Sequence, residues 1–174
     1  MKKSLSVVLL IVFIVAGVFL NESCGKAQAS KLRFEISFLS SVHAESITGR
    51  VFIMISRNKQ REPRLQAGFW MRSVPFFGVD VEGLEPGEKA EIDENTLGFP
   101  LKSLRDIPPG DYFVQGLINV YTEFHRSDGH VIWAHKDQWE GQRFNRSPGN
   151  LYSEIQSVHL EPSKGYTIKL RLDK

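Results

Sequence analysis

Apolar and polar residues alternate along much of the chain after residue 30, with the period of a β-strand. Leu32–Phe38 (LRFEISF) alternates in the way that is typical of a strand with one face on a core. Gly49–Ser56 (GRVFIMIS) is a denser apolar run, of the kind found in a central strand. The strongest signal is Tyr112–Tyr121 (YFVQGLINVY), and we expect a strand of this length to cross the whole domain.

Shorter segments predict further strands, and turn residues separate them. These strands are Phe76–Glu82, Lys89–Asp93, Ile155–Leu160 and Tyr166–Leu172. Pro86-Gly87 and Pro109-Gly110 each place a proline, which presets φ, before a glycine, which accepts a positive φ. Polar loops between consecutive strands indicate antiparallel pairing.

The pattern as a whole predicts an all-β protein. No segment has a helical stripe of ten or more residues, although Thr96–Arg105 has room for one short helical turn. Several strands with Pro-Gly turns between them indicate a β-sandwich of the immunoglobulin or fibronectin type III kind. Pro108–Gln115 (PPGDYFVQ) agrees with this, because a turn in such sandwiches often introduces a central strand that carries a tyrosine.

The first 29 residues have the three-part layout of a secretory signal peptide. Two lysines precede the apolar segment Val7–Leu20, and the small-residue pattern Ala27-Gln28-Ala29 ends the leader. The apolar segment is shorter than the roughly 20 residues that a membrane-spanning helix needs, and the polar residues Asn21-Glu22-Ser23 end it. We therefore expect cleavage after Ala29, a secreted or periplasmic protein, and a single β-sandwich domain over residues 30–174.

The only cysteine, Cys24, lies inside this leader. A lipoprotein would be processed there, but Asn21–Ser23 is not the small apolar run expected before such a site, so lipidation is disfavoured. The mature domain then has no disulfide and depends on its hydrophobic core. It keeps 19 basic and 19 acidic side chains with no basic run, so we expect neither a nucleic-acid partner nor, after cleavage, a membrane partner.

Known catalytic motifs are missing from the sequence. No serine has the flanking glycines of Gly-x-Ser-x-Gly, the elbow that lifts the nucleophile toward its histidine in α/β hydrolases. The zinc-protease motif His-Glu-x-x-His, the P-loop and the dinucleotide-binding glycine pattern are also absent. We therefore identify no catalytic residue, no metal ligand set and no cofactor.

One polar cluster does contain residue types that bind divalent metals: His125, Asp128, His130, His135 and Asp137. The simpler interpretation is a β-hairpin with Asp128-Gly129 at its tip and the histidines on its two strands. Alternation along the second strand would then place His130 and Ile132 on one face and Val131 and Trp133 on the other, so the candidate ligands need not all face the same way. We favour the hairpin and keep the metal site as the alternative.

The stretch His135–Glu154 (HKDQWEGQRFNRSPGNLYSE) is rich in aromatic and polar residues. Together with Trp133 it offers a platform for a sugar ring or an aromatic ligand, with hydrogen-bonding neighbours. The candidate ligand-binding residues are Trp133, His135, Asp137, Trp139, Arg143, Asn145 and Tyr152. The alternative, which we favour because large aromatics pack more often than they bind, is that these aromatics and Phe144 cap the open end of the sandwich.

Three phrases resemble a known family: PFFGVDVEGLEPGE, PLKSLRDIPPGDYFVQGLINVYTEFHRSDGHVIWAHKDQWEGQ and NRSPGNLYSE. They are similar to the N-terminal, non-catalytic region of large secreted bacterial esterases, the enterochelin-esterase-like α/β hydrolases, over about Phe76 to Pro162. In that family the β-sandwich precedes a hydrolase domain that holds the catalytic residues. The resemblance implies the sandwich fold, export and a supporting role in presenting or binding substrate, and it leaves open whether this chain is a stand-alone relative or part of a longer esterase.

Three hypotheses about function follow. The first, which we favour, is an exported accessory or binding module that contacts a hydrolase domain or chain, or a carbohydrate or ester ligand. The second is a metal-dependent hydrolase that uses the His125–His135 cluster. The third is a purely structural envelope protein with the same fold.

Overall fold

The computed structural model describes residues 31–68, 72–138 and 143–174. Strands dominate these residues, and they form two sheets that pack face to face, so the predicted all-β sandwich is confirmed. The predicted leader, residues 1–29, lies outside the described residues. Within the part of the chain that is described, no helix is long and apolar enough to cross a membrane.

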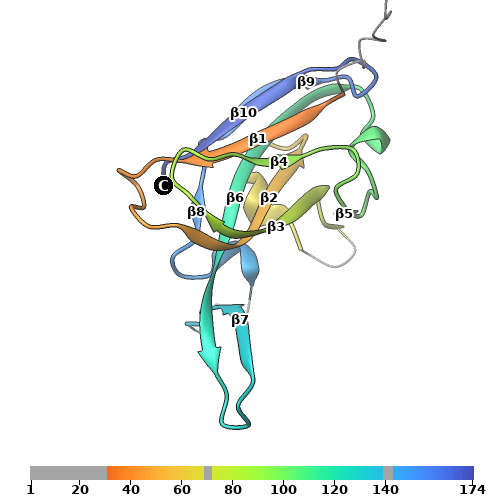
Figure 1. Ribbon diagram of the computed structural model, residues 1–174. Coiled ribbons are helices and arrows are strands. Elements are labelled where there is room, and N and C mark those ends of the chain that lie inside the picture. Colours follow the sequence, from red (N-terminus) through yellow and green to blue (C-terminus); the bar gives the residue numbers. More distant parts are fainter. Residues whose placement is uncertain (1–30, 69–71, 139–142) are drawn as a thin grey trace, which may run out of the picture.

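The smaller sheet has three strands in the order β10-β1-β4 (Figure 1). Its strands are β1 (Arg33–Phe38), β4 (Ala90–Ile92) and β10 (Thr167–Leu172). The central strand β1 pairs in parallel with β10 and antiparallel with β4, so the first and last described strands of the chain lie side by side.

The larger sheet runs in the order β5-β3-β2-β6-β7. Its strands are β2 (Ile47–Ser56), β3 (Phe76–Leu84), β5 (Gly98–Phe99), β6 (Gly110–His125) and β7 (Val131–His135). Two more strands, β8 (Leu151–Tyr152) and β9 (Gln156–Leu160), also pair with β6. Short helical turns lie between strands: α2 (Pro63–Gln66), η2 (Leu104–Asp106) and η3 (Phe144–Arg146).

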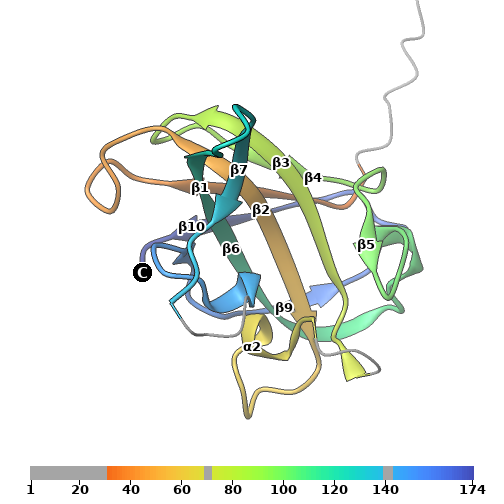
Figure 2. The same cartoon turned by 90° about the horizontal axis from the view of Figure 1, so that it is seen from below.

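The core lies between the two sheets, and the strand alternation explains its composition. Phe34 and Ile36 of β1 point inward and are fully buried, as are Val51 and Ile53 of β2. These positions recur every second residue, as expected for strands that bury one face. The turned view in Figure 2 shows the smaller sheet lying across the larger one, so that the inner faces of both are covered.

The outer face of the larger sheet carries a second, smaller cluster. Phe52 and Met54 of β2 and Leu117 of β6 are buried there against the segment around Ala67 and against Phe144. The Phe52 and Phe144 rings lie 4.7 Å apart between centroids. Because β2 is buried on both faces over this stretch, it reads as a continuous apolar run in the sequence, as predicted for a central strand.

Strand β6 is longer than the sequence pattern predicts. The predicted strand ends at Tyr121, whereas β6 continues to His125 and pairs with β7 from Tyr121 to His125. This extension and β7 form a hairpin that projects beyond the sandwich (Figure 1). Its tip is the predicted Asp128-Gly129 turn, in which Gly129 has φ 85°. Both faces of a projecting hairpin meet solvent, so no apolar alternation marks its strands.

Other expectations are confirmed with small changes. Apart from the extended end of β6, each predicted strand appears with its boundaries moved by at most two residues. The helical turn expected in Thr96–Arg105 is the 3₁₀ turn η2 at the end of that segment, while Gly98–Phe99 forms the short strand β5. Pro63–Gln66, in the charged segment after β2, forms the short helix α2.

Tyr112 fixes the entry of the chain into β6. Its hydroxyl donates to the Pro108 carbonyl at 2.6 Å and accepts from Arg57 Nη2 at 2.8 Å. The Arg57 guanidinium also lies over the Tyr112 ring, 4.8 Å from its centroid. A tyrosine that bonds back to the backbone a few residues upstream is the tyrosine corner of immunoglobulin-like sandwiches.

We predict that Tyr112→Phe lowers the free energy of unfolding by about 1–2 kcal/mol, because the Pro108 carbonyl and the Arg57 guanidinium both lose a partner. The matched control is Tyr121→Phe, whose hydroxyl makes no hydrogen bond to the described residues and which should change stability by less than about 0.5 kcal/mol. Urea denaturation followed by tryptophan fluorescence measures both. Equal losses of stability in the two variants would contradict a stabilising role for the Tyr112 hydroxyl.

Candidate functional site

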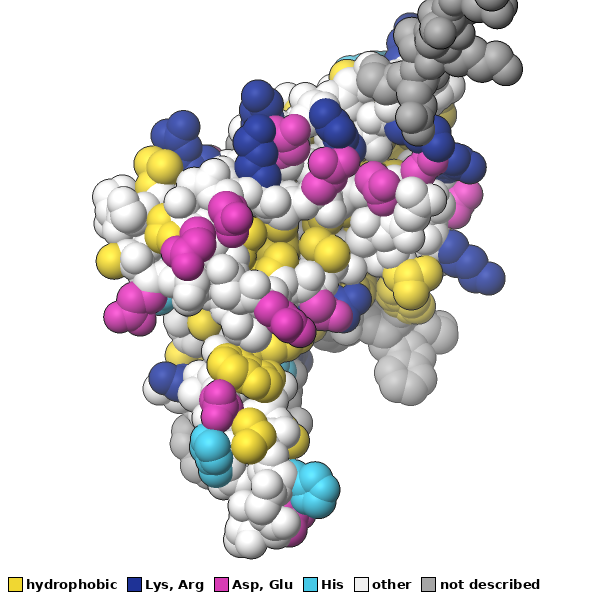
Figure 3. Space-filling model, viewed as in Figure 1, with side chains coloured by type: hydrophobic (Ala, Val, Ile, Leu, Met, Phe, Trp, Pro, Cys, Tyr) yellow, Lys and Arg dark blue, Asp and Glu magenta, His cyan; other side chains and the backbone are white. Residues whose placement is uncertain are grey.

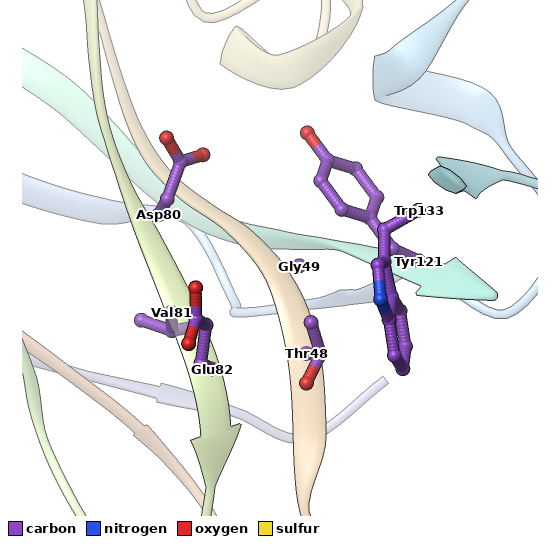
Figure 4. Close-up of a pocket in the computed structure, with 7 residues that line it drawn as sticks. All are labelled: Thr48, Gly49, Asp80, Val81, Glu82, Tyr121 and Trp133. Atoms are coloured by element: carbon purple, nitrogen blue, oxygen red, sulfur yellow. The ribbon is translucent and has the colours of Figure 1, made fainter. Parts of the chain in front are cut away.

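A cleft of about 390 Å³ lies on the outer face of the larger sheet, where the β6–β7 hairpin leaves the sandwich. Its lining residues come from strands β2, β3, β6 and β7: Thr48, Gly49, Asp80, Val81, Glu82, Tyr121 and Trp133. Figure 4 shows the two aromatic side chains on one side and the two carboxylates on the other, with Gly49 between them. The cleft therefore has an aromatic wall and an acidic wall.

The floor of the cleft is backbone. Gly49 of β2 pairs with Val120 of β6, and a Cβ atom at Gly49 would lie 2.2 Å from the Asn119 carbonyl oxygen. Only glycine fits this close approach of two strands. Gly49 therefore contributes only backbone to the lining of the cleft.

The acidic wall is formed by β3. Asp80 and Glu82 are two residues apart, so both point to the outer face of the sheet, and both are exposed. Arg50 Nη1 donates to both Asp80 carboxylate oxygens at 3.1 Å. The Glu82 carboxylate, in contrast, has no hydrogen bond or ion pair to any residue that the structure describes. The negative charge on this wall is therefore only partly compensated.

The aromatic wall is formed by the hairpin. Tyr121 of β6 stands opposite His135 of β7, and Trp133 of β7 stands opposite Glu123 of β6, so all four side chains share one face. Burial raises the pKa of the Tyr121 phenol, the nearby Asp80 carboxylate raises it further, and Arg50 opposes the shift. Tyr121 therefore stays neutral at physiological pH. The Trp133 side chain is 49% exposed and open to a ligand.

The predicted ligand-binding residues divide into two groups, and the first lies on or beside the hairpin. Trp133 lines the cleft. His135, at the end of β7, is half-buried opposite Tyr121, and Asp137 is exposed just beyond the strand. Trp139 lies outside the described residues.

The second group lies in the segments around α2 and η3 that cover the outer apolar cluster, which we call the cover. The amide nitrogen of Asn145 donates to the Arg64 and Ala67 carbonyls, at 2.6 and 3.2 Å, and only 5% of the residue is exposed. The Tyr152 ring packs under the Arg64 guanidinium at 3.9 Å. Arg143 is exposed, and its carbonyl accepts hydrogen bonds at the start of η3. These three residues are therefore not brought to the cleft.

Buried amide side chains of β6 attach this cover to the sheet. Asn119 Nδ2 donates to the Phe144 carbonyl and to Asn150 Oδ1, at 3.1 and 2.9 Å. Gln115 accepts from the Arg64 backbone N–H and donates to the Ser153 carbonyl, at 3.1 and 3.0 Å. Buried polar groups with such partners hold a loop in one place. In the described part of His135–Glu154, Phe144 and Tyr152 thus have a packing role, on the outer face of the larger sheet rather than at the open end of the sandwich.

Of the lining residues, only Trp133 was predicted from the sequence; the polar and aromatic side chains that were missed are Thr48, Asp80, Glu82 and Tyr121. The alternation of Val79–Glu82 does place Asp80 and Glu82 on one face of a strand. What the sequence lacks is the strand order that sets β3 beside β2 and the hairpin beyond them. A carboxylate pair on an exposed strand face is otherwise an ordinary solvated surface.

The candidate metal ligands do not converge. His125 Nε2 lies 2.6 Å from Glu123 Oε1, and His130 Nδ1 lies 3.2 Å from Asp128 Oδ1. His135 is four residue pairs farther along the hairpin than His125, a separation of about 13 Å. Among the described residues, no group of three or more His, Cys, Asp or Glu side chains is placed to hold a metal ion.

We predict that Asn145→Ala lowers the free energy of unfolding by about 1–3 kcal/mol, because the buried Arg64 and Ala67 carbonyls lose their donor. Asn95→Ala is the matched control, since Asn95 is exposed and its amide bonds only within its own turn. It should change stability by less than about 0.5 kcal/mol. Thermal and urea denaturation measure both variants, and an Asn145 variant as stable as the control would contradict the anchoring role.

Comparison of the chain with protein-family models, with curated proteins and with solved structures found no match.

Proposed function

We propose that this protein is an exported, non-catalytic binding module that accompanies a hydrolase, and that it binds its ligand in the cleft at the base of the β6–β7 hairpin. The observation that carries the proposal is the cleft itself, about 390 Å³ in volume, with aromatic side chains facing carboxylates. A concave site with apolar surface and a few polar groups is the usual form of a small-molecule site.

The construction of the cleft supports a binding role. Its walls are strand residues of one continuous sheet rather than residues of long loops. Strands are held in position by the backbone hydrogen bonds of the sheet. Residues on them are therefore already ordered, and little conformational entropy is lost when a ligand binds. The two aromatic residues supply large contact area, and the carboxylates and the Thr48 hydroxyl supply polar contacts.

The projecting hairpin supports the association with a hydrolase. Phe124 and Ile132 stand opposite each other on the hairpin face away from Trp133, and both are exposed. Figure 3 shows hydrophobic side chains along this projection and histidines near its end. Exposed apolar residues on a protruding element suit contact with another domain. The export and the hydrolase partner rest on the leader pattern and on the resemblance to the N-terminal region of secreted esterases.

A thermal-shift screen of residues 30–174 tests the proposal. The panel contains neutral sugars, short-chain esters and organic cations, and a ligand that binds the folded state stabilises it by an amount that grows with its concentration, about 2.7 kcal/mol at 100 times its Kd. We expect at least one class to raise the melting temperature. Melting temperatures that stay constant across the panel would count against a small-molecule site.

The tryptophan of the aromatic wall should be necessary for that stabilisation. We predict that Trp133→Ala abolishes the shift caused by the active ligand, because most of the aromatic contact is lost. Ile132→Ala is the matched control, since Ile132 is the next residue of β7, is similarly exposed at 43%, and faces the other way. Retention of the shift in the Trp133 variant, measured beside the control, would place the ligand elsewhere.

A further inference from the structure

We infer that the cleft selects an organic cation, specifically an alkyl- or methyl-substituted ammonium group. The inference rests on the proposed binding function and adds the class of ligand. It follows from the charge of the acidic wall, the nature of the aromatic wall and the openness of the site.

The charge of the lining is negative. Two of the seven lining residues are carboxylates, Asp80 and Glu82, and none is basic. Of the two carboxylates, Arg50 pairs only with Asp80, and its Nη2 donates to the Gly78 carbonyl at 3.2 Å. Its guanidinium lies 5.8 Å from the Phe52 ring centroid, next to the outer apolar cluster rather than in the cleft lining. The Glu82 carboxylate is thus left for a positively charged ligand.

The aromatic wall favours the same charge. The face of a tryptophan or tyrosine ring carries the negative end of its quadrupole and attracts a cation near the ring centroid. Trp133 and Tyr121 stand together on this wall, opposite the carboxylates (Figure 4). Because Tyr121 keeps its proton, the wall contributes ring faces and a neutral hydroxyl. An alkylammonium group uses both walls at once, since its carbon atoms contact the rings while its charge faces the carboxylates.

The shape of the site indicates which part of the ligand enters it. Trp133 keeps about half of its side chain in solvent, and the carboxylates are exposed. The cleft therefore holds a terminal group and leaves the remainder of the ligand outside. A bare metal ion fits less well, because Val81, Trp133 and the Tyr121 ring present apolar surface, whereas hard cations such as Ca²⁺ and Mg²⁺ are surrounded by oxygen ligands.

Isothermal titration of residues 30–174 with choline, and with its neutral isostere 3,3-dimethyl-1-butanol, tests the role of charge. The two probes have nearly the same shape, so a difference in affinity reports the charge. We expect choline to bind at least about tenfold more tightly, with an affinity that falls as salt is added. Equal affinities, or no choline binding, would overturn the inference.

Two substitutions locate the effect. Glu82→Gln keeps the size of the side chain and should weaken choline binding by about three- to tenfold. Glu91→Gln removes the same charge from the other sheet, where Glu91 forms only an exposed pair with Arg33, and should leave choline affinity unchanged. If the two variants weaken binding equally, the effect is one of net charge and the cleft is not the site.

The source of the cation is distinguished by a third probe, N-acetyl-lysine methylamide, which presents the ammonium group of a polypeptide side chain. Tighter binding of choline indicates a methylated small molecule, and tighter binding of the lysine probe indicates a protein ligand. If a neutral sugar or ester binds in a Trp133-dependent way while choline does not, the inference fails and the proposed function stands. If Trp133→Ala affects no ligand, the proposed function itself fails.

Discussion

The backbone ladder of β6 is the interaction on which the rest of the structure depends. This one strand of 16 residues pairs with β9 near its start, with β2 through its middle, with β8 beside that stretch and with β7 at its end. Its inward side chains, such as Val114 and Ile118, fill the core between the sheets. Because the same strand continues out of the sandwich as the hairpin, the position of the aromatic wall is set by the hydrogen bonds of the core.

The outer face of the larger sheet has two regions along the same strands: one is covered by other segments of the chain, and the other forms the cleft. Where Phe52 and Leu117 need cover, buried amides of Gln115 and Asn119 fix the segments around α2 and η3 over them. Toward the start of β2, before Phe52, this cover ends. The residues there are Thr48 and Gly49, and the space beside them is bordered by β3 and the hairpin. The cleft therefore begins where the outer face no longer carries buried apolar side chains.

The sequence predicts the fold better than it predicts the site. Alternation and apolar runs identify β1, β2, β3, β4, β6, β9 and β10 because each buries at least one face, and the Asp128-Gly129 signal predicts the hairpin tip. The site depends on strand order and register, which alternation does not encode. Trp133 was among the predicted residues, but Asn145 and Tyr152 proved to support the cover, and Asp80 and Glu82 looked like ordinary surface charges. Their partnership with Trp133 arises only when β3 and the hairpin are placed beside β2.

The central claim is that the surface between β3 and the hairpin is where this module meets its ligand. The most direct test is a two-dimensional NMR titration of isotope-labelled residues 30–174 with the ligand that stabilises the protein most. The account predicts that the indole signal of Trp133 and the amide signals of Gly49 and Glu82 shift together and saturate at one concentration. Shifts confined to the smaller sheet, over residues 33–38 and 167–172, would contradict it.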